Sequence, residues 1–303
     1  MTNAMPDRPK ILFVGTCQTI GMAIAARVML PHAEISSCQP AAVPHLTEAA
    51  IASTLQQYDL VISQFGDHNL ESPLRPTSLR TANINFIYLP TFVFAGFHPD
   101  CVYLGRDGTI LRGTESDYHS AIAVAGFCMG LDVKRVCRLY NSLVFAELGY
   151  IAVYDDARNA IKANFAAAGY DLEPLLRMWT AEGTPFMHTT NHPTVFALAG
   201  LAHAALVNGG VVPASAGIPR GLPDDLGKLL TWPVFQPVAR RAGVPSRANF
   251  LRSIHGLKEG EPRELSLEDF VERSFSLYRD VDQGLLRTGS VPAVIERLGT
   301  LVS

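Results

Sequence analysis

Paired cysteine motifs are missing from this chain of 303 residues. The cysteines are odd in number, and no two stand in a C-x-x-C arrangement; they are Cys17, Cys38, Cys101, Cys128 and Cys137. Disulfide frameworks and zinc sites use paired, closely spaced cysteines, so the pattern argues against both. Free thiols persist in a reducing compartment, and we therefore expect a cytoplasmic protein without a metal.

Charge is also scarce. Charged residues make up 17% of the chain, and the formal net charge is −3. This balance provides no field that would attract nucleic acid or an anionic membrane surface. Hydrophobic residues reach 48%, which favours a large buried core over disorder. An anionic ligand would have to be held by local donors.

Long apolar runs are absent as well. The longest nearly uncharged stretches cover residues 120–131 and 195–207, short of the ~20 residues of a membrane-spanning helix. The first ten residues are polar and contain no apolar segment typical of a signal peptide. We predict a soluble chain with no membrane insertion.

Short apolar runs alternate with helical patterns in the first part of the chain. Strands are predicted at residues 10–14, 33–37, 59–64 and 85–89, and helices at 20–30 and 46–57. Strands that alternate with helices predict an α/β fold with a parallel sheet covered by helices on both faces.

The pattern becomes mainly helical after about residue 115. Helices are predicted at 116–131, 132–148, 155–168, 172–182, 193–207, 224–230, 233–242, 266–277 and 292–301. We therefore expect an α/β core in residues 1–115. Residues 116–303 would form a large helical addition that completes the active site. No clear linker separates the two, so one continuous domain is also compatible with the sequence.

Gly15, Thr16, Cys17 and Gln18 lie between the first predicted strand and the helix that follows. Backbone N–H groups converge at such a turn, where the helix dipole is positive. This environment is expected to lower the pKa of the Cys17 thiol and to supply donors for an oxyanion or a phosphate. Two other interpretations remain: Cys17 as a small packing residue, and a dinucleotide fingerprint, which lacks its second glycine here.

His192 is the candidate base for this thiol. It precedes Pro193, which suits the first turn of the next helix and places His192 in a loop near the N-cap. His188 competes for the same role. A loop histidine that only caps a helix is the simpler interpretation, but a nucleophilic thiol requires a nearby base.

Further polar residues follow the third and fourth predicted strands. Gln64 ends the third strand, and Gly66 and Asn69 come directly after it. Because ligands bind beyond the carboxyl ends of parallel strands, these residues are expected to border the same crevice as Cys17 and to offer oxyanion donors. His98 and Asp100 follow the fourth strand; they either orient a ligand or belong to an ordinary turn.

Taken together, these motifs resemble the WcbI-type family, acetyltransferases proposed for capsular polysaccharide biosynthesis. The matching segments are spread over residues 10–205, about two thirds of the chain: Gly15-Thr16-Cys17-Gln18, Gln64, Gly96-Phe97-His98-Pro99-Asp100, Tyr118-His119-Ser120, Leu148-Gly149-Tyr150 and Asn191-His192-Pro193.

The resemblance implies an SGNH-like (GDSL hydrolase-like) topology, a coenzyme A ligand and acetyl transfer to a sugar hydroxyl. In SGNH enzymes a nucleophilic serine occupies the turn where Cys17 stands here. Their last block, Asp-x-x-His, is matched by His192, while Thr189 stands at the aspartate position. The resemblance thus implies a Cys–His dyad, or a triad that Asp100 or Asn191 completes.

The expected function is an acetyl-CoA-dependent O-acetyltransferase that acts on a capsular sugar or glycan. The expected catalytic residues are Cys17, His192, Gln18, Asn191 and Gln64, and the expected cofactor contacts are Gly15, Thr16, His98, Asp100 and His188. An SGNH-like esterase or thioesterase is the first alternative, and a non-catalytic protein that binds coenzyme A or glycan is the second. Several cations are candidates for the coenzyme phosphates, and none is selected: Lys134, Arg135, Arg138, Arg240, Arg241, Arg252 and Lys258.

Overall fold

The computed structural model describes residues 6–39, 48–69 and 72–302. The chain forms two compact units, each assembled from three segments. Unit 1 contains Met1–Val93, Ile161–Ala181 and His192–Leu226; unit 2 contains Phe94–Ala160, Glu182–Asn191 and Gly227–Ser303. The predicted boundary near residue 115 falls inside the first segment of unit 2. Because the segments interleave, no single linker marks the units in the sequence.

Unit 1 is built on a parallel sheet. Its strands are β1 (Lys10–Val14), β2 (Glu34–Cys38), β3 (Leu60–Ser63) and β4 (Phe86–Tyr88), in the order β2-β1-β3-β4. Strand β1 lies in the middle, and its apolar residues are buried on both faces, as expected for a central parallel strand. The predicted α/β fold with a parallel sheet is confirmed.

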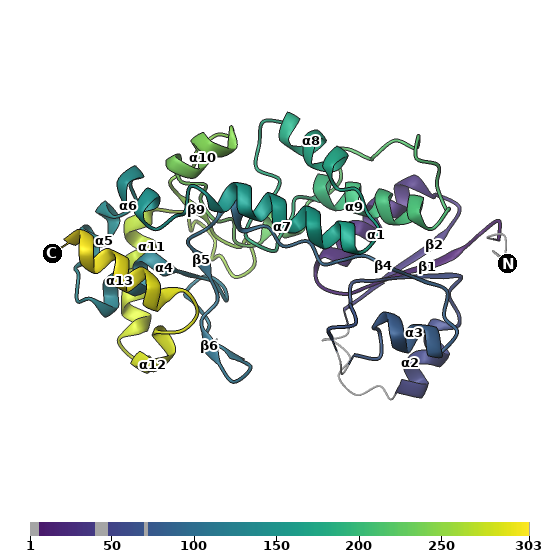
Figure 1. The fold of residues 1–303 in the computed structure, drawn as a ribbon, viewed down its shortest axis with the longest axis horizontal. Coiled ribbons are helices and arrows are strands. Elements are labelled where there is room, and N and C mark those ends of the chain that lie inside the picture. Colours follow the sequence, from purple (N-terminus) through teal and green to yellow (C-terminus); the bar gives the residue numbers. More distant parts are fainter. Residues whose placement is uncertain (1–5, 40–47, 70–71, 303) are drawn as a thin grey trace. The chain divides into compact units, whose positions relative to one another are not determined.

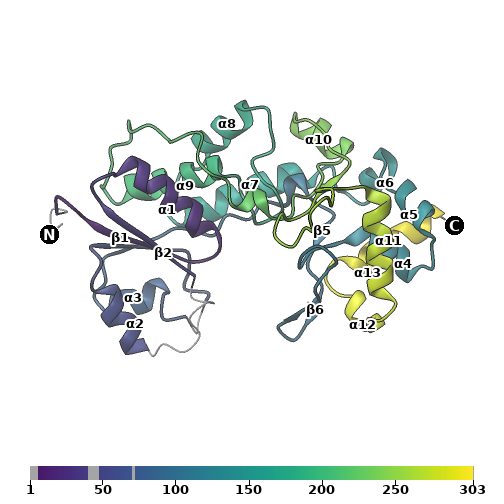
Figure 2. The ribbon, with the colours of Figure 1, turned by 180° about the vertical axis from the view of Figure 1, so that it is seen from behind.

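Helices cover both faces of this sheet (Figures 1 and 2). On one face lie α1 (Gln18–Met29) and α9 (Val195–Asn208), and on the other lie α2 (Glu48–Leu55) and α3 (Pro76–Thr81). Helix α8 (Glu173–Ala181) packs against α9. Gly21 of α1 faces α9 so closely that a Cβ there would lie 2.5 Å from Cδ1 of Leu198. A glycine at this position therefore permits the close α1–α9 contact.

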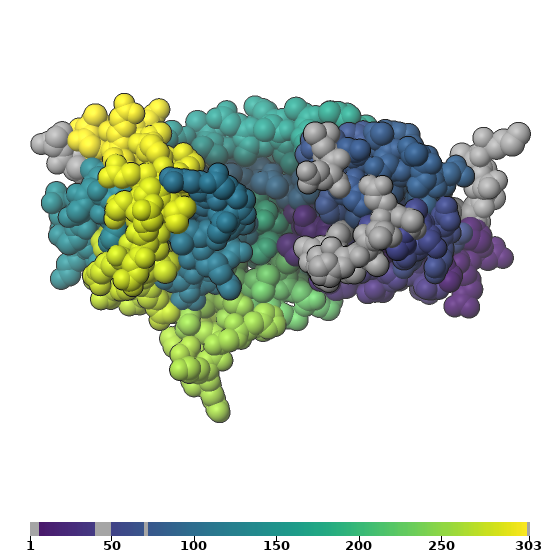
Figure 3. Space-filling model, turned by 90° about the horizontal axis from the view of Figure 1, so that it is seen from below, coloured from purple at the N-terminus to yellow at the C-terminus, as the bar shows by residue number. Residues whose placement is uncertain are grey.

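Unit 2 is mainly helical and centres on α4 (Ala121–Cys128), whose first residues are fully buried. Helix α4 packs against α11 (Leu267–Tyr278) and α13 (Val291–Val302), and α11 also packs against α5 (Val133–Arg138). Figure 3 shows the yellow C-terminal residues against the blue and teal residues of the segment 94–160. The remaining helices with residues in this unit are α6 (Ser142–Glu147), α7 (Val153–Ala167), which ends in unit 1, α10 (Gln236–Ala242) and α12 (Gln283–Leu286).

The helix predicted over residues 116–131 is shorter than expected. Residues His119–Ser120 form β8, which pairs with β5 (Cys101–Val102), and Ser120 then caps α4 by accepting a hydrogen bond from the N–H of Ala123. Two further antiparallel pairs in unit 2 were also not predicted: β6 (Gly105–Arg106) with β7 (Thr109–Ile110), and β9 (Phe250–Leu251) with β10 (Glu264–Leu265). Strands β6 and β7 are joined by Asp107-Gly108, whose positive φ values of 53° and 79° are typical of a two-residue hairpin turn, so the sequence did contain a signal for this pair. The strands of the other two pairs lie farther apart in the sequence, and local periodicity does not reveal such pairing.

The predicted helix 132–148 is two helices. Asn141 begins α6 as its N-cap, and its side-chain oxygen accepts a 3.1 Å hydrogen bond from the N–H of Val144. Asparagine favours such caps over helix interiors, so the sequence did contain this signal. The helix predicted near 224–230 is a short 3-10 turn over Leu226–Lys228.

In the part of the chain that the structure describes, no helix has the length and apolar character needed to cross a membrane. All five cysteines are free thiols. A cytoplasmic location remains a prediction.

A half-buried ion-pair network stabilises unit 2. Glu115 accepts from Arg252 Nε at 2.9 Å and from Arg273 Nη1 at 2.8 Å, and its side chain is only 8% exposed. We expect Glu115→Gln to lower the free energy of unfolding by about 2 kcal/mol, because two cations lose their shared carboxylate. Urea denaturation would measure this. Asp117→Asn is the control: its partner Arg112 is 85% exposed, so no measurable change is expected. Equal effects of the two variants would contradict the prediction.

Candidate active site

Cys17 lies at the turn between β1 and α1. It is the N-cap residue of α1, with helical φ and ψ of −53° and −20°, and its side chain is half-buried. Two residues before it, the N–H of Gly15 donates to the carbonyl of Cys38 on the neighbouring strand β2 at 3.1 Å. The strand-to-helix turn predicted for this residue is confirmed.

The pKa of the Cys17 thiol is raised. Burial is the largest cause, and the hydrogen bonds from the backbone N–H groups of Cys17 and Gln18, which lower the pKa, offset it only in part. The sequence-based expectation of a lowered pKa was therefore wrong in direction. A thiol with a raised pKa is protonated at neutral pH, and it needs a base if it is to act as a nucleophile.

Gln64 holds the Cys17 turn from the end of β3. Its Oε1 accepts hydrogen bonds from the N–H of Thr16 at 2.9 Å and from the hydroxyl of Thr16 at 3.0 Å. A Cβ at Gly15 would lie 2.4 Å from this same oxygen. Gly15 is thus required by the close approach of the Gln64 side chain to the backbone.

Gln18 extends this contact to the loop after β4. Its Nε2 donates to the carbonyl of Phe92 at 2.7 Å, while its Oε1 accepts from the N–H of Phe92 at 3.1 Å and from Gln64 Nε2 at 3.0 Å. Gln18 is 1% exposed. The linked amides of Gln18 and Gln64 therefore connect the segments that follow β1, β3 and β4. Direct catalytic roles for Gln18 and Gln64 remain predictions.

A cavity of about 370 Å³ lies in unit 1 beside this turn. Side chains from four segments line it, including residues that the sequence reasoning did not select as site residues. Its lining consists of Gly15, Thr16, Gln64, Phe65, His68, Asn69, Tyr88, Thr91 and Asn164. Of these, His68 belongs to the loop after β3 that also contains the predicted residues Gly66 and Asn69. Asn164 comes from α7, far along the sequence from the other lining residues, and no local sequence pattern indicated it.

Gly66 and Asn69 form a tight turn at the rim of this cavity. The N–H of Gly66 donates to Asn69 Oδ1 at 3.1 Å, and the N–H of Asn69 donates back to the carbonyl of Gly66 at 3.0 Å. A Cβ at Gly66 would lie 2.8 Å from the ring of His68 and from the hydroxyl of Tyr88. The Gly66 N–H is therefore already used inside the turn and is not presented to a ligand in this arrangement.

His192 lies two residues before the N-cap of α9. Thr194 is the N-cap, and its hydroxyl accepts from the N–H of Ala197 at 3.3 Å. The prediction that Pro193 lies in the first turn of this helix is wrong, because Pro193 precedes the N-cap. Like Cys17, His192 belongs to unit 1. The helices that follow them, α1 and α9, touch at Gly21 and Leu198, the fourth residue of each.

The other predicted site residues belong to unit 2. Asn191 Oδ1 accepts from the hydroxyl of Tyr118 and, at 3.3 Å, from that of Thr189, while its Nδ2 donates to the Tyr103 hydroxyl at 3.0 Å. Thr189 also donates to the hydroxyl of Tyr118 at 3.1 Å. The threonine hydroxyl thus orients Asn191 and Tyr118. His188, also in unit 2, lines a separate cavity described below.

His98 is a buried, neutral histidine. Its Nδ1 lies 3.2 Å from the carbonyl of Pro233 and its Nε2 lies 3.4 Å from the carbonyl of Met187. Burial lowers its pKa to about 4. Both ring nitrogens face carbonyls of the chain itself, so the structure shows a packing role. Contact with coenzyme A remains a prediction for this residue.

Asp100 stabilises the beginning of α4. Its Oδ1 accepts from the N–H of Ile122 at 2.8 Å, and its backbone carbonyl accepts from the N–H of Ala121. Its side chain is fully buried, and burial raises its pKa to about 7 against these hydrogen bonds. Its predicted roles in cofactor binding or in orienting His192 stay untested.

The raised pKa of Asp100 makes stability depend on pH. The folded state binds the proton more tightly than the unfolded chain, whose carboxyl has an ordinary pKa of 3.8. The resulting stabilisation is complete below about pH 4 and is lost as the pH rises to about 7. We expect Asp100→Asn, which removes this dependence, to gain stability over the wild type by about 2–4 kcal/mol across that range. Thermal melts at pH 4 and pH 8 would measure it, and a constant difference would contradict it.

Among residues 6–39, 48–69 and 72–302, no three histidine, cysteine or acidic side chains converge in a way that would hold a metal ion. The expectation of a metal-free site stays a prediction.

The fold and the site define an α/β protein with a cysteine-bearing site at the carboxyl edge of a parallel sheet. A family described as "Polysaccharide biosynthesis enzyme WcbI" matches residues 10–213. The chain belongs to this family of polysaccharide biosynthesis enzymes. The family resemblance inferred from the sequence motifs is confirmed.

The chain is also similar to a solved structure of WcbI, described as a novel polysaccharide biosynthesis enzyme, in its native form without a disulfide bond between coenzyme A and a cysteine. The TM-score is 0.70 at 13% sequence identity, and the match covers 96% of this chain and 99% of the other. At this identity the likeness establishes the fold. A search of curated proteins gave no match.

Proposed function

We propose that the protein is an acetyl-CoA-dependent O-acetyltransferase that modifies a sugar hydroxyl in capsular polysaccharide biosynthesis. The observation that carries the proposal is the half-buried Cys17 thiol at the N-cap of α1, in a turn whose residues Gly15 and Thr16 line a cavity at the ends of the parallel strands. Membership of a polysaccharide biosynthesis family supports it. So does the structural neighbour, whose description mentions a disulfide bond between coenzyme A and a cysteine that its native form lacks.

In the proposed two-step route, His192 removes the proton from Cys17. The sulfur attacks the carbonyl carbon of acetyl-CoA, the bond from that carbon to the coenzyme sulfur breaks, and the coenzyme thiol leaves with the proton from His192. The sugar hydroxyl then gives its proton to His192 and its oxygen attacks acetyl-Cys17. The bond from the acetyl carbon to the Cys17 sulfur breaks, and the sulfur takes the proton back from His192. In the alternative direct route, His192 deprotonates the sugar hydroxyl, which attacks acetyl-CoA itself.

Backbone N–H groups of the Cys17–Gln18 turn are the proposed oxyanion donors, because they lie at the positive end of α1. Gln64 and Gln18 act as positioning residues in this proposal, since their amides hold the turn through Thr16 and Phe92. The parallel strand order β2-β1-β3-β4 with helices on both faces supports an SGNH-like topology.

The proposal is tested by incubating the protein with acetyl-CoA and analysing intact mass and peptides. Acetyl-Cys17 that disappears when a sugar acceptor is added supports the two-step route, whereas sugar acetylation without acetyl-Cys17 supports direct transfer. Release of acetate in the absence of a sugar would instead favour the esterase or thioesterase. Calorimetry that detects no binding of coenzyme A would contradict the proposal.

A further inference from the structure

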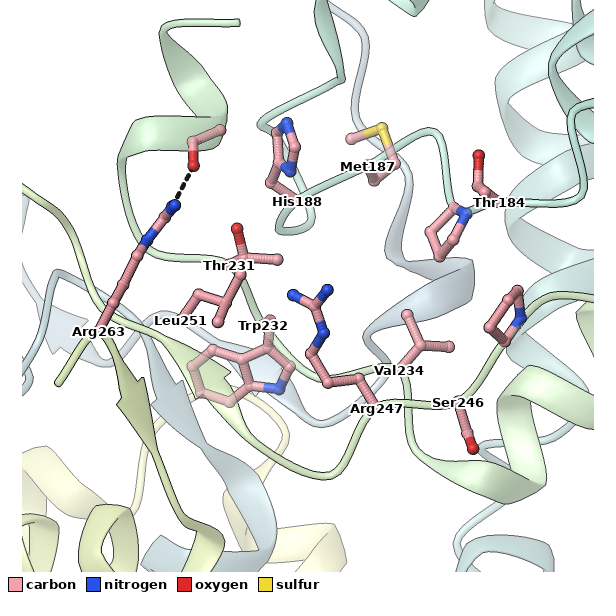
Figure 4. Close-up of a pocket in the computed structure, with 13 residues that line it drawn as sticks. Thr184, Met187, His188, Thr231, Trp232, Val234, Ser246, Arg247, Leu251 and Arg263 are labelled. Carbon is pink, nitrogen blue, oxygen red and sulfur yellow. Dashed lines mark hydrogen bonds between the residues drawn. The ribbon is translucent and has the colours of Figure 1, made fainter.

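A second cavity, of about 380 Å³, is lined by residues of unit 2 (Figure 4). Three segments, at residues 184–188, 227–234 and 245–251, line it, and Arg263 adds a further side chain. Four of the lining residues, Thr231, Trp232, Arg247 and Arg263, carry side-chain groups that can donate a hydrogen bond. No part of the proposed transfer chemistry uses this cavity.

The lining carries positive charge without a carboxylate. Arg263 donates from Nε to the carbonyl of Arg252 at 3.1 Å and from Nη2 to the carbonyl of Gly227. These acceptors are neutral, so they fix the guanidinium without cancelling its charge. No aspartate or glutamate lines the cavity. A concave, cationic surface of this kind attracts an anion.

Among the residues that line the cavity, Arg247 has the guanidinium best able to donate hydrogen bonds to a ligand. Its backbone N–H binds the carbonyl of Val234 at 2.9 Å, which anchors the residue, while its guanidinium has no hydrogen-bond or ion-pair partner in the described part of the chain. Figure 4 shows this guanidinium pointing into the pocket between Thr231 and Val234, toward His188 and Met187. The buried Trp232 Nε1 is another donor that finds no acceptor among the described residues.

From these observations we infer that the cavity binds a phosphoryl group, with Arg247 as its principal contact. A guanidinium pairs with two phosphate oxygens through parallel N–H bonds, and the fixed charge of Arg263 adds to the attraction. The Thr231 hydroxyl offers a further hydrogen bond. The phosphate belongs either to coenzyme A or to a phosphate-linked sugar acceptor. The inference concerns unit 2 and does not depend on acetyl transfer at Cys17.

The test is calorimetric titration of the intact protein with pyrophosphate, coenzyme A, dephospho-coenzyme A and UDP-glucose. We expect Arg247→Gln to weaken at least one of these affinities about tenfold or more. Arg279→Gln is the matched control: it removes the same charge from unit 2 at an exposed position outside the cavity, and its affinities should equal those of the wild type. Arg247 suits this test because its side chain is exposed and forms no hydrogen bond or ion pair with any described residue.

The four ligands separate the two sources of phosphate. If wild-type protein prefers coenzyme A to dephospho-coenzyme A and Arg247→Gln loses the preference, the coenzyme 3′-phosphate occupies the cavity. If only UDP-glucose binding weakens, the cavity takes the acceptor. Unchanged affinities in Arg247→Gln, equal losses in Arg279→Gln, or no binding of any ligand by the wild type would overturn the inference. Cys17→Ala should retain the binding, which keeps this test independent of the proposed function.

Discussion

Replacement of Cys17 by alanine is expected to lower kcat for acetyl transfer at least about a thousandfold, with coenzyme A binding retained. The sulfur is the proposed nucleophile, and no neighbouring group of the turn can replace it. Thr16 has its hydroxyl hydrogen-bonded to Gln64, and the Gln18 amide is bound to Phe92. Steady-state kinetics with acetyl-CoA and calorimetry with coenzyme A would measure the two effects.

Cys17→Ser sharpens this prediction. A serine hydroxyl keeps nearly the same shape but ionises far less readily than a thiol, so we expect its activity to stay close to that of the alanine variant. Cys137→Ala is the control, because Cys137 is also a half-buried thiol but belongs to α5 of unit 2, whereas Cys17 belongs to unit 1. Full transfer activity in Cys17→Ala would rule out the two-step route.

His192→Ala should reduce kcat by about 10²–10⁴, the usual contribution of a positioned general base. The expectation is strengthened by the raised pKa of the Cys17 thiol, because a protonated thiol gains more from a base than an ionised one. Initial rates across a pH series would measure the loss. They should also show whether the variant recovers at high pH, where hydroxide deprotonates the thiol directly.

His32→Ala is the control for this variant. His32 is an exposed histidine of unit 1 just beyond α1, and its loss should leave the rate unchanged. His188→Ala separates the two candidate bases. A loss in His188→Ala that exceeds the loss in His192→Ala would show that the base assignment is wrong. Circular dichroism of each variant checks that the fold is intact.

The sheet of unit 1 could be read from the sequence because each strand has a local apolar pattern. The run at Lys10–Val14 ends at Gly15, and the observed β1 has the same bounds. Central parallel strands are buried on both faces, so they appear as continuous apolar runs that differ from the helices between them. The same reasoning failed at His119–Ser120, where pairing with Cys101–Val102 competes with helix formation.

Part of the candidate site could also be predicted. Gly15, Thr16, Cys17 and Gln64 were selected because they follow strands, and the structure brings them together through the Gln64 side chain. His98 and Asp100 were chosen by the same rule, but the structure buries them in unit 2 against backbone groups. A position after a strand indicates where a residue can lie, whereas burial and hydrogen-bond partners decide its chemistry.

Local sequence patterns were sufficient to predict the parallel α/β architecture, the position of Cys17 at a strand-to-helix turn and the family. These features depend on local periodicity, on turn residues and on short motifs, which are all visible within a few neighbouring positions. Tertiary structure alone decided the raised pKa of Cys17, the interleaved units and the gathering of Arg247 and Arg263 at one cavity. Desolvation and charge depend on which distant segments pack around a group, and no local pattern encodes that packing.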